Sequence, residues 1–424
     1  MNRITQALSR NAQVSGYKIN IHEKESYELF FVKGKLETLR RTDTCDKQVT
    51  VYVSHGDYLG DAQFHVYPST TDAQLENLIQ EAVEKALLIQ NPAYTLPPAD
   101  TGDYRVPSNF EDRPVQDLAA AVANAVFAAD TIPGGSLNAV EIFLNRHTDT
   151  VANSNGLHKR QVRYDAMVEA IPTYTSDGRS VELYEQYNFA NLDEAVLLRE
   201  IAEKMTAVKA RFEAVTPDFP LECPVILNAE ELAMLAWNIA GDLNYASVYG
   251  HYNLFRKGEC IQQNPTGDLL GITMAGFVPG CVRSARFDGD GLTLDSIRLV
   301  EAGNAVNYYG SNRYGQYLGE TATGDLRCLC LDAGSAGPED FLAGPYLNVV
   351  SMSDLQVDFY NDYIGGEVRL AYYHDGQKQI PVTGISISGK LSEILSTLRL
   401  SRNVTTVNGY HGPEQALLSH MKIY

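Results

Sequence analysis

Asn228-Ala-Glu-Glu-Leu-Ala-Met-Leu-Ala-Trp-Asn-Ile-Ala-Gly-Asp242 is the clearest strand-to-helix transition in the chain. It follows the short apolar run 223–227, which is typical of a strand. Asn228 is a favourable helix N-cap, and Glu231 stands at capping-box spacing from it. Apolar side chains then recur at helical spacing, at Leu232, Leu235, Ala236, Ile239 and Ala240. The stretch predicts an amphipathic helix that Gly241 can end. This helix carries no His and no Cys, and its carboxylates lie at its two ends.

Length and charge limit the classes of function. The 424 residues are 44% apolar and 21% charged, and they carry a formal net charge of −19. Such a composition is that of a globular protein, and the length suggests two or three domains. The negative charge repels phosphate backbones, and the basic residues form only short clusters such as 158–160. We therefore expect no nucleic-acid partner.

The N-terminus lacks an apolar stretch of signal-peptide length, and no window approaches the roughly 18 apolar residues of a membrane span. Six cysteines are too sparse for a disulfide scaffold in a chain of this length. We expect no membrane partner and a cytoplasmic location, where thiols stay reduced.

The chain divides into three expected units. Residues 1–105 contain strand-like runs at 17–22, 27–32, 35–40, 48–53 and 59–66, followed by a helix that a Thr71–Gln74 capping box opens. Residues 106–216 repeat the pattern of strands and helices after a proline-rich linker, with a turn at 153–156. Residues 217–424 hold many short strands punctuated by glycine. The predicted fold class is α+β: two similar units of antiparallel sheet plus helices, then a large β-rich C-terminal domain.

Catalytic motifs are absent from the sequence. The His22-Glu23 pair lacks a second His at helical spacing and is interpreted as surface. Cys328 and Cys330 share one face of a strand and are expected to be structural thiols. His251 either faces a cleft beside the central helix or lies in a solvated loop. No Gly-x-Ser-x-Gly elbow, phosphate loop or dinucleotide motif occurs.

Several strings nevertheless occur in the order and spacing typical of one family. They are Leu59-Gly-Asp-Ala62, Asn153-Ser-Asn-Gly156, Leu299-Val-Glu-Ala-Gly303, Tyr317-Leu-Gly-Glu-Thr-Ala-Thr-Gly324, Gly365-Gly-Glu-Val-Arg-Leu370, Ile380-Pro-Val-Thr-Gly384, Ile387-Ser-Gly389 and 391–398. Together they resemble the TldD/PmbA family, cytoplasmic peptidase-related proteins also labelled modulators of DNA gyrase.

The resemblance implies a zinc site in the TldD-type members. These carry His-Glu-x-x-x-His on the helix after the first strand of the large domain, and a distant Cys completes the ligand set. At the matching positions this chain has Ala236, Trp237 and Gly241, and Asn408 lies where the Cys would fall. The resemblance therefore implies a PmbA/TldE-like subunit that lacks its own zinc site.

The expected function is a non-catalytic subunit of a TldD-type zinc metallopeptidase complex that acts on unfolded or small peptides. Whether the chain is itself an enzyme stays open. The expected partners are a TldD-type subunit in a heterodimer, or a second copy in a homodimer, and an extended peptide; zinc belongs to the TldD-type partner. The alternatives are a divergent peptidase active alone, using residues such as Asp242, His251 or His411, and a protein-binding modulator without peptide chemistry. We name no catalytic or metal residue; the candidate groove residues are Trp237, Asn238, Asp242, His251 and Asn408.

Overall fold

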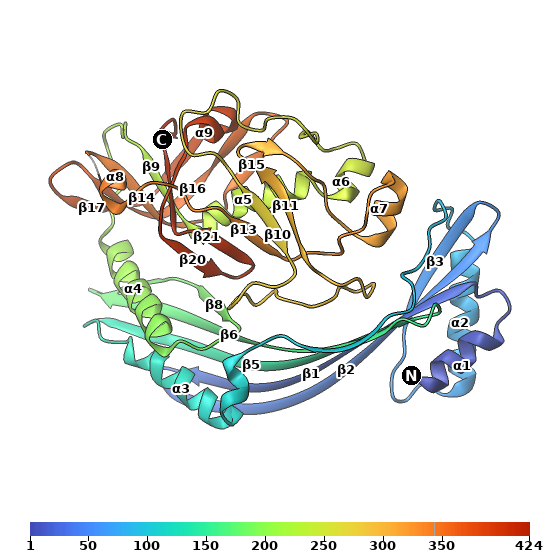
Figure 1. Cartoon of the computed structure of the whole chain (residues 1–424). Helices are drawn as coiled ribbons and strands as arrows, with labels where there is room; N and C mark the ends of the chain where they lie inside the picture. The colour runs from blue at the N-terminus through green and yellow to red at the C-terminus, as the bar shows by residue number, and fades with distance from the viewer. Residues whose placement is uncertain (343) are drawn as a thin grey trace.

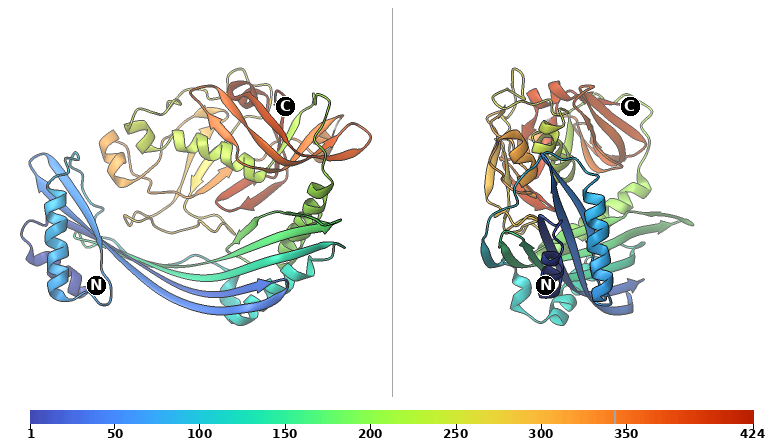
Figure 2. Two further views of the ribbon diagram at one scale, coloured as in Figure 1. Left: turned by 180° about the vertical axis from the view of Figure 1, so that it is seen from behind. Right: turned by 90° about the vertical axis from the view of Figure 1, so that its right-hand side faces the viewer.

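The computed structural model of this protein describes residues 1–342 and 344–424. They form a long curved sheet with helices packed at both ends, and a C-terminal lobe that lies over the concave side of the sheet (Figure 1, Figure 2). Helices and mostly antiparallel strands are both abundant, so the predicted α+β class is confirmed. Among the described residues no helix is long and apolar enough to cross a membrane.

The long sheet has eight strands. Their order is β3-β2-β1-β5-β6-β4, with β7 and β8 also paired to β6. Their bounds are β1 (Gly16–Val32), β2 (Lys35–His55), β3 (Tyr58–His65), β4 (Thr101–Arg105), β5 (Gly135–Asn153), β6 (His158–Ser176), β7 (Arg179–Glu182) and β8 (Glu185–Phe189). Only β4 runs parallel to its neighbour, which is β6. The strands of the two expected N-terminal units thus pair in one sheet, and their division at residue 105 stays a prediction.

The strands are longer than we expected. The runs 17–22 and 27–32 belong to one strand, β1, and the runs 35–40 and 48–53 belong to β2. The predicted breaks are wrong because the polar residues between the runs find partners on neighbouring strands. Ser26 Oγ donates to Asn145 Oδ1 of β5 over 2.8 Å, and Thr42 Oγ1 donates to Glu28 Oε1 of β1 over 3.0 Å.

Helices cover the two ends of this sheet. Helices α1 (Asn2–Arg10) and α2 (Asp72–Ala86) pack on one end, around a core that includes Ile19 and Leu75. The predicted Thr71–Gln74 capping box opens α2. Helices α3 (Val115–Ala128) and α4 (Glu194–Glu213), with the short η1 (Asn109–Asp112) before α3, cover the other end.

The lobe contains two further sheets. One has six strands in the order β12-β11-β10-β13-β21-β20, and the other has nine, with the path β19-β22-β9-β14-β16-β18-β23 and β15 and β17 paired to β16. Their bounds are β9 (Val225–Asn228), β10 (Ile272–Ala275), β11 (Ser296–Glu301), β12 (Asn304–Ala305), β13 (Cys328–Leu331), β14 (Tyr346–Met352), β15 (Gln356–Asp358), β16 (Tyr363–His374), β17 (Gln379–Val382), β18 (Ile385–Lys390), β19 (Arg399–Leu400), β20 (Val404–Val407), β21 (Tyr410–Pro413), β22 (Gln415–Leu418) and β23 (Lys422–Ile423).

Helix α5 (Ala229–Asp242) is the helix that we expected from the central stretch, and it lies in the core of the lobe. It contacts β9 and β22 of the nine-stranded sheet and β10, β13, β20 and β21 of the six-stranded sheet. Its apolar side chains are almost fully buried because both sheets close over them. The remaining helices of the lobe are α6 (Tyr245–Tyr249), α7 (Asn312–Leu318), α8 (Pro338–Phe341) and α9 (Leu391–Thr397).

A short segment, residues 91–95, links the long sheet to the lobe, and we call it the strap. The ring of Tyr94 meets the ring of Tyr317 on α7 edge-on, with centroids 6.0 Å apart. Tyr317 Oη donates to the carbonyl of Pro92 over 2.7 Å. The guanidinium of Arg313 lies 5.5 Å from the Tyr317 ring centroid and 5.9 Å from that of Tyr94. These contacts hold the lobe against the sheet at the β3 end.

Candidate functional site

A cleft of about 510 Å³ lies between the long sheet and the lobe. Its walls come from β8, the first half of α4, the start of α5, the middle of β14 and the turn that follows β20. Figure 1 shows β20 on the side of the lobe nearest β8. Among the described residues β8 is paired only with β6, and β20 only with β21, so each strand has a free edge at the cleft.

The free edge of β20 presents main-chain groups. Val407 pairs with Tyr410 across the two-residue turn Asn408-Gly409. The carbonyl of Gly409 accepts a hydrogen bond from the N–H of Leu329 on β13, so it points away from β20. The main-chain N–H and C=O of Tyr410 therefore point towards β20. Because the direction alternates along a strand, the N–H and C=O of Thr406 point away from β21. Thr406 also lines the cleft.

Helix α5 brings its first turn to the cleft. The Asn228 side chain accepts a bond from Glu230 N over 2.9 Å, so the predicted N-cap is confirmed. Glu231 does not complete a capping box; its side chain is buried instead, with only 6% of the residue exposed. Burial raises the pKa of the Glu231 carboxyl to about 7.

Of the five candidate groove residues, Asn408 lines the cleft. Its φ of 53° is the left-handed conformation that a tight turn requires. Its Oδ1 accepts a bond from Asn188 Nδ2 of β8 over 2.8 Å. This contact joins the lobe to the long sheet across the cleft.

Trp237 and Asn238 lie farther along α5 and do not line the cleft. The Trp237 ring is half-buried against the lobe core, and the Arg283 guanidinium lies 5.5 Å from its centroid. Asn238 is exposed, and its Nδ2 donates to the carbonyl of Met234 one turn earlier. Both stay predictions as groove residues.

Asp242 is the last residue of α5, and His251 follows the short helix α6, so both lie beyond the C-terminal end of α5 from the cleft. The Asp242 carboxylate accepts bonds from Leu254 N and Phe255 N, both over 2.8 Å, and thereby anchors the loop after α6. Burial raises the Asp242 pKa, and the two backbone bonds oppose this effect. His251 is exposed in a left-handed turn with φ of 61° and lines neither the cleft nor the pocket described below.

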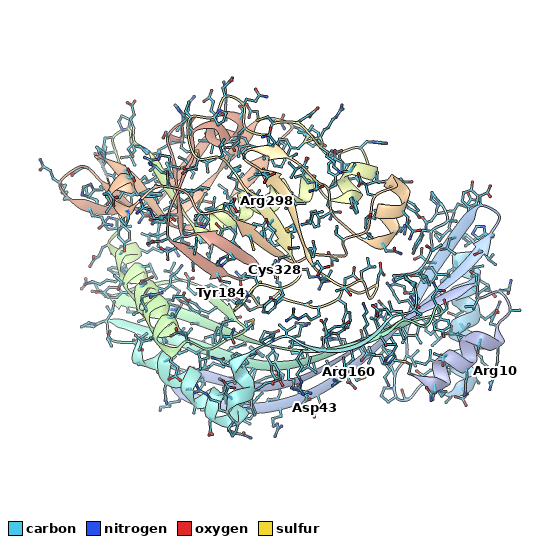
Figure 3. The ribbon with its side chains drawn as sticks, in the orientation of Figure 1. Arg10, Asp43, Arg160, Tyr184, Arg298 and Cys328 are labelled. Atoms are coloured by element: carbon cyan, nitrogen blue, oxygen red, sulfur yellow. The ribbon has the colours of Figure 1, made fainter. Side chains whose placement is uncertain are left out.

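Two thiols meet beside the Asn408 turn. Cys281 Sγ and Cys328 Sγ are 3.1 Å apart, and Cys281 also contacts the Asn408 carbonyl over 3.4 Å. The hydrogen bond from Cys328 lowers the pKa of the Cys281 thiol to about 7, and the same contact raises that of Cys328. In Figure 3 Cys328 lies on the side of the lobe that faces the sheet. Cys330 packs against this pair, and the structural role of Cys328 and Cys330 stays a prediction.

A second hollow of about 540 Å³, the polar pocket, lies between the middle of the sheet and residues 282–289 of the lobe. His22 lines this pocket and donates from Nδ1 to Asp149 Oδ1 over 2.6 Å. Its Nε2 lies 3.4 Å from Nδ1 of His147. His147 Nε2 lies 2.7 Å from Asp165 Oδ2, an electrostatic contact whose angle departs from that of a hydrogen bond.

Sequence reasoning missed this cluster because its members are far apart in the chain. The pairing of β1 with β5 sets His22 opposite Asp149 and Lys24 opposite His147. Burial raises the Asp149 pKa, but the hydrogen bond from His22 and the charge of Arg163 outweigh it and hold that pKa well below its ordinary range. In the described part of the chain, no three or more His, Cys, Asp or Glu side chains gather as metal ligands.

Comparisons with known proteins agree with this architecture. Residues 220–424 match the family model described as the PmbA/TldA metallopeptidase C-terminal domain. A crystal structure of TldE from Thermococcus kodakarensis matches with a TM-score of 0.78 and 15% identity, covering 100% of this chain and 99% of that one. No curated protein matches the chain.

Two further solved structures share the fold. Both are named as candidate modulators of DNA gyrase. The protein from Bacteroides thetaiotaomicron has a TM-score of 0.78 and 11% identity and covers 100% of this chain and 97% of its own. The protein from Thermotoga maritima has a TM-score of 0.70 and 16% identity, and the match covers 100% of both chains. The C-terminal lobe, residues 220–424, thus belongs to the TldD/PmbA family, and the whole chain shares its fold with these three structures.

Proposed function

We propose that this chain is the non-catalytic, peptide-holding subunit of a TldD-type zinc metallopeptidase complex. The observation that carries the proposal is the cleft between two free strand edges, β8 and β20. A free edge binds an extended chain through main-chain hydrogen bonds, and such binding does not depend on the peptide sequence. A folded substrate could not present its backbone in this way, so the cleft suits unfolded or small peptides.

The donor set on α5 supports the non-catalytic role. A catalytic zinc of this kind needs imidazole ligands and a carboxylate that polarises water. Ala236, Trp237 and Gly241 offer neither, and the nearby thiol pair Cys281 and Cys328 is engaged in its own hydrogen bond. The residues present do not fit a zinc ion, so we assign the metal and the hydrolytic step to a TldD-type partner.

The likeness to the Thermococcus kodakarensis TldE supports a TldE-like subunit. A heterodimer with a TldD-type chain is the assembly that we propose, and self-association is the alternative. The six cysteines are all free thiols, which suits the reducing cytoplasm in which we place the protein.

The test combines the isolated chain with a TldD-type partner that carries His-Glu-x-x-x-His. We expect the isolated chain to bind no stoichiometric zinc and to cleave no peptide. We expect the mixture to bind zinc stoichiometrically and to cleave peptides. Stoichiometric zinc or peptide turnover without the partner would overturn the proposal and favour a peptidase active alone. Binding to gyrase without any effect on peptide cleavage would favour a modulator.

A substitution at the free edge of β20 tests the peptide-holding role directly. Thr406→Pro removes the N–H that points into the cleft and leaves the β20–β21 ladder intact. We expect it to raise the KM of the complex for an extended peptide by about tenfold, because one main-chain bond is lost. Thr406→Val is the matched control, since it removes the same hydroxyl and keeps the N–H.

A further inference from the structure

Two thiols of the lobe lie close enough to react with each other. Cys281 stands in the loop after β10, and Cys328 is the first residue of β13, at a sequence separation of 47. Their Sγ atoms are 3.1 Å apart, and both cysteines are free thiols. The sulfur atoms of a disulfide are about 2.05 Å apart, so a displacement of roughly 1 Å would close this pair.

The two sulfur atoms differ in acidity. The hydrogen bond from Cys328 lowers the pKa of the Cys281 thiol to about 7, against the effect of burial, and the charge of Arg283 also lowers it. At neutral pH a large share of Cys281 is therefore thiolate, the form that reacts with oxidants. The same contact raises the pKa of Cys328, so that residue keeps its proton. The pair thus consists of a reactive sulfur and a second sulfur within its reach.

The thiol pair is buried but close to the cleft. Cys281 is 2% exposed and Cys328 is 1% exposed, whereas Gly280, the residue before Cys281, lines the cleft. The loop around Cys281 is made of two tight turns. Cys281 N donates to Val278 O over 3.1 Å, and Ser284 N donates to Cys281 O over 3.2 Å. Local opening of such a loop costs less than global unfolding, and it would admit a molecule as small as hydrogen peroxide from the cleft.

We propose that Cys281 and Cys328 are a reversible redox pair, which a small hydroperoxide such as hydrogen peroxide closes to a disulfide. In the first step the Cys281 thiolate attacks the peroxide. An S–O bond forms, the O–O bond breaks, and the hydroxide that leaves takes up a proton to become water. The product is a sulfenic acid on Cys281.

In the second step the Cys328 sulfur attacks the Cys281 sulfur. The S–S bond forms, the S–O bond breaks, and the hydroxyl group leaves with the Cys328 thiol proton as a second water. The two thiols together lose two electrons, and the peroxide gains them. A dithiol reductant reverses the change by thiol–disulfide exchange. Such transient disulfides are the kind that occur in the cytosol.

The disulfide would act on the cleft through Asn408. In its protonated form Cys281 contacts the Asn408 carbonyl over 3.4 Å, and a disulfide has no proton to donate. The Asn408 side chain in turn accepts the hydrogen bond from Asn188 of β8 across the cleft. Oxidation is therefore expected to loosen the turn between β20 and β21. This inference does not depend on the proposed function, because the disulfide and its effect on the turn can both be measured in the chain without peptide or partner.

The first experiment identifies the disulfide. The full chain is treated with hydrogen peroxide, its remaining thiols are blocked with iodoacetamide, and its tryptic peptides are analysed by mass spectrometry. Cleavage after lysine and arginine gives the peptides 258–283 and 328–369, which contain Cys281 and Cys328 respectively. We expect a cross-link between these two peptides, and we expect dithiothreitol to remove it.

Each of these peptides carries a second cysteine, and these cysteines supply the matched controls. Cys281→Ala should abolish the cross-link, and so should Cys328→Ala. Cys260→Ala and Cys330→Ala change the other cysteine of the same two peptides and should leave the cross-link in place. A wild-type chain without the cross-link, or a cross-link that survives Cys281→Ala, overturns the proposal.

A second experiment measures hydrogen exchange in the reduced and the oxidised chain. We expect exchange in residues 404–410 to become about twofold faster on oxidation, the effect of losing one weak hydrogen bond. Peroxide-treated Cys281→Ala should show no such change, and dithiothreitol should restore the slower exchange of the wild type. A disulfide that forms without this change supports the redox pair and overturns its link to the cleft.

Discussion

Nε2 of His22 and Nδ1 of His147 lie 3.4 Å apart on adjacent strands, and the outer nitrogen of each ring faces a carboxylate. A chain of contacts thus runs from Asp149 through His22 and His147 to Asp165, and it ties β1 to β5 and β6.

Removal of one ring should therefore destabilise the sheet. We expect His147→Gln to lower the free energy of unfolding by about 1–3 kcal/mol, because His147 is buried and two partners lose its contacts. Urea denaturation at neutral pH measures the change. The control is His65→Gln, which removes a 2.7 Å contact between two exposed side chains, His65 and Asp46, and is expected to cost under about 1 kcal/mol. Equal losses in both variants would contradict this role.

Acid stability should depend on Asp149. Its pKa is lower in the folded protein than its ordinary value of 3.8, so the folded state binds fewer protons than the unfolded state. The stability that this carboxylate contributes is present above pH 3.8 and is lost as the pH falls below that value. We expect Asp149→Asn to be less stable than the wild type at pH 6 and to lose less stability on acidification. If the wild type and the Asp149→Asn variant lost equal amounts of stability between pH 6 and pH 2, this prediction would be contradicted.

Glu231 should have the opposite dependence on pH. Burial raises its pKa from 4.5 to about 7, so the folded state binds the proton more tightly than the unfolded state. The penalty for ionisation is absent below pH 4.5, grows as the pH rises and is complete above about pH 7. This ionisation penalty is on the order of 3 kcal/mol, taking about 1.4 kcal/mol for each pKa unit. We expect Glu231→Gln to be more stable than the wild type at pH 8, by thermal denaturation, and similar to it at pH 4.5.

The strap should open locally when its anchor is removed. Tyr317→Phe keeps the aromatic contact with Tyr94 but loses the hydrogen bond to Pro92 and the contact with Arg313 Nε. We expect faster hydrogen exchange in residues 91–95 and a loss of about 1 kcal/mol in stability. Tyr314→Phe, on the same helix, is the control, since its ring also lies beside Arg313 without a bond to the strap. Exchange that is unchanged in both variants would mean that the strap is held by its other contacts.

Local signals in the sequence predicted the helices well. The capping box of α2 and the cap and apolar periodicity of α5 depend on residues within two turns of each other, so they can be recognised without tertiary knowledge. The continuity of β1 and β2 could not be recognised in this way, because the polar residues Ser26 and Thr42 find their partners on other strands.

The candidate site was harder to predict for the same reason. Asn408 was identified through the family resemblance and does line the cleft. Thr406 carries no motif, and its unpaired main-chain groups become evident only once β20 is seen to be an edge strand beside the cleft. The pairing of His22 with His147 depends on strand register across a sequence separation of 125 residues, which no local pattern encodes.

The uninterrupted length of β1 constrains how this protein can evolve. β1 pairs with β2 on one side and with β5 on the other over nearly all of its 17 residues, with one shift of register against β2 between Phe30 and Phe31. Side chains alternate between the faces of a sheet, so one residue inserted in mid-strand would send every side chain beyond it to the wrong face. Leu29 would leave the apolar core beneath α3 and α4. Single insertions and deletions are therefore expected in the turns at 33–34 and 154–157, and the span of the sheet can change only by matched changes in three strands at once.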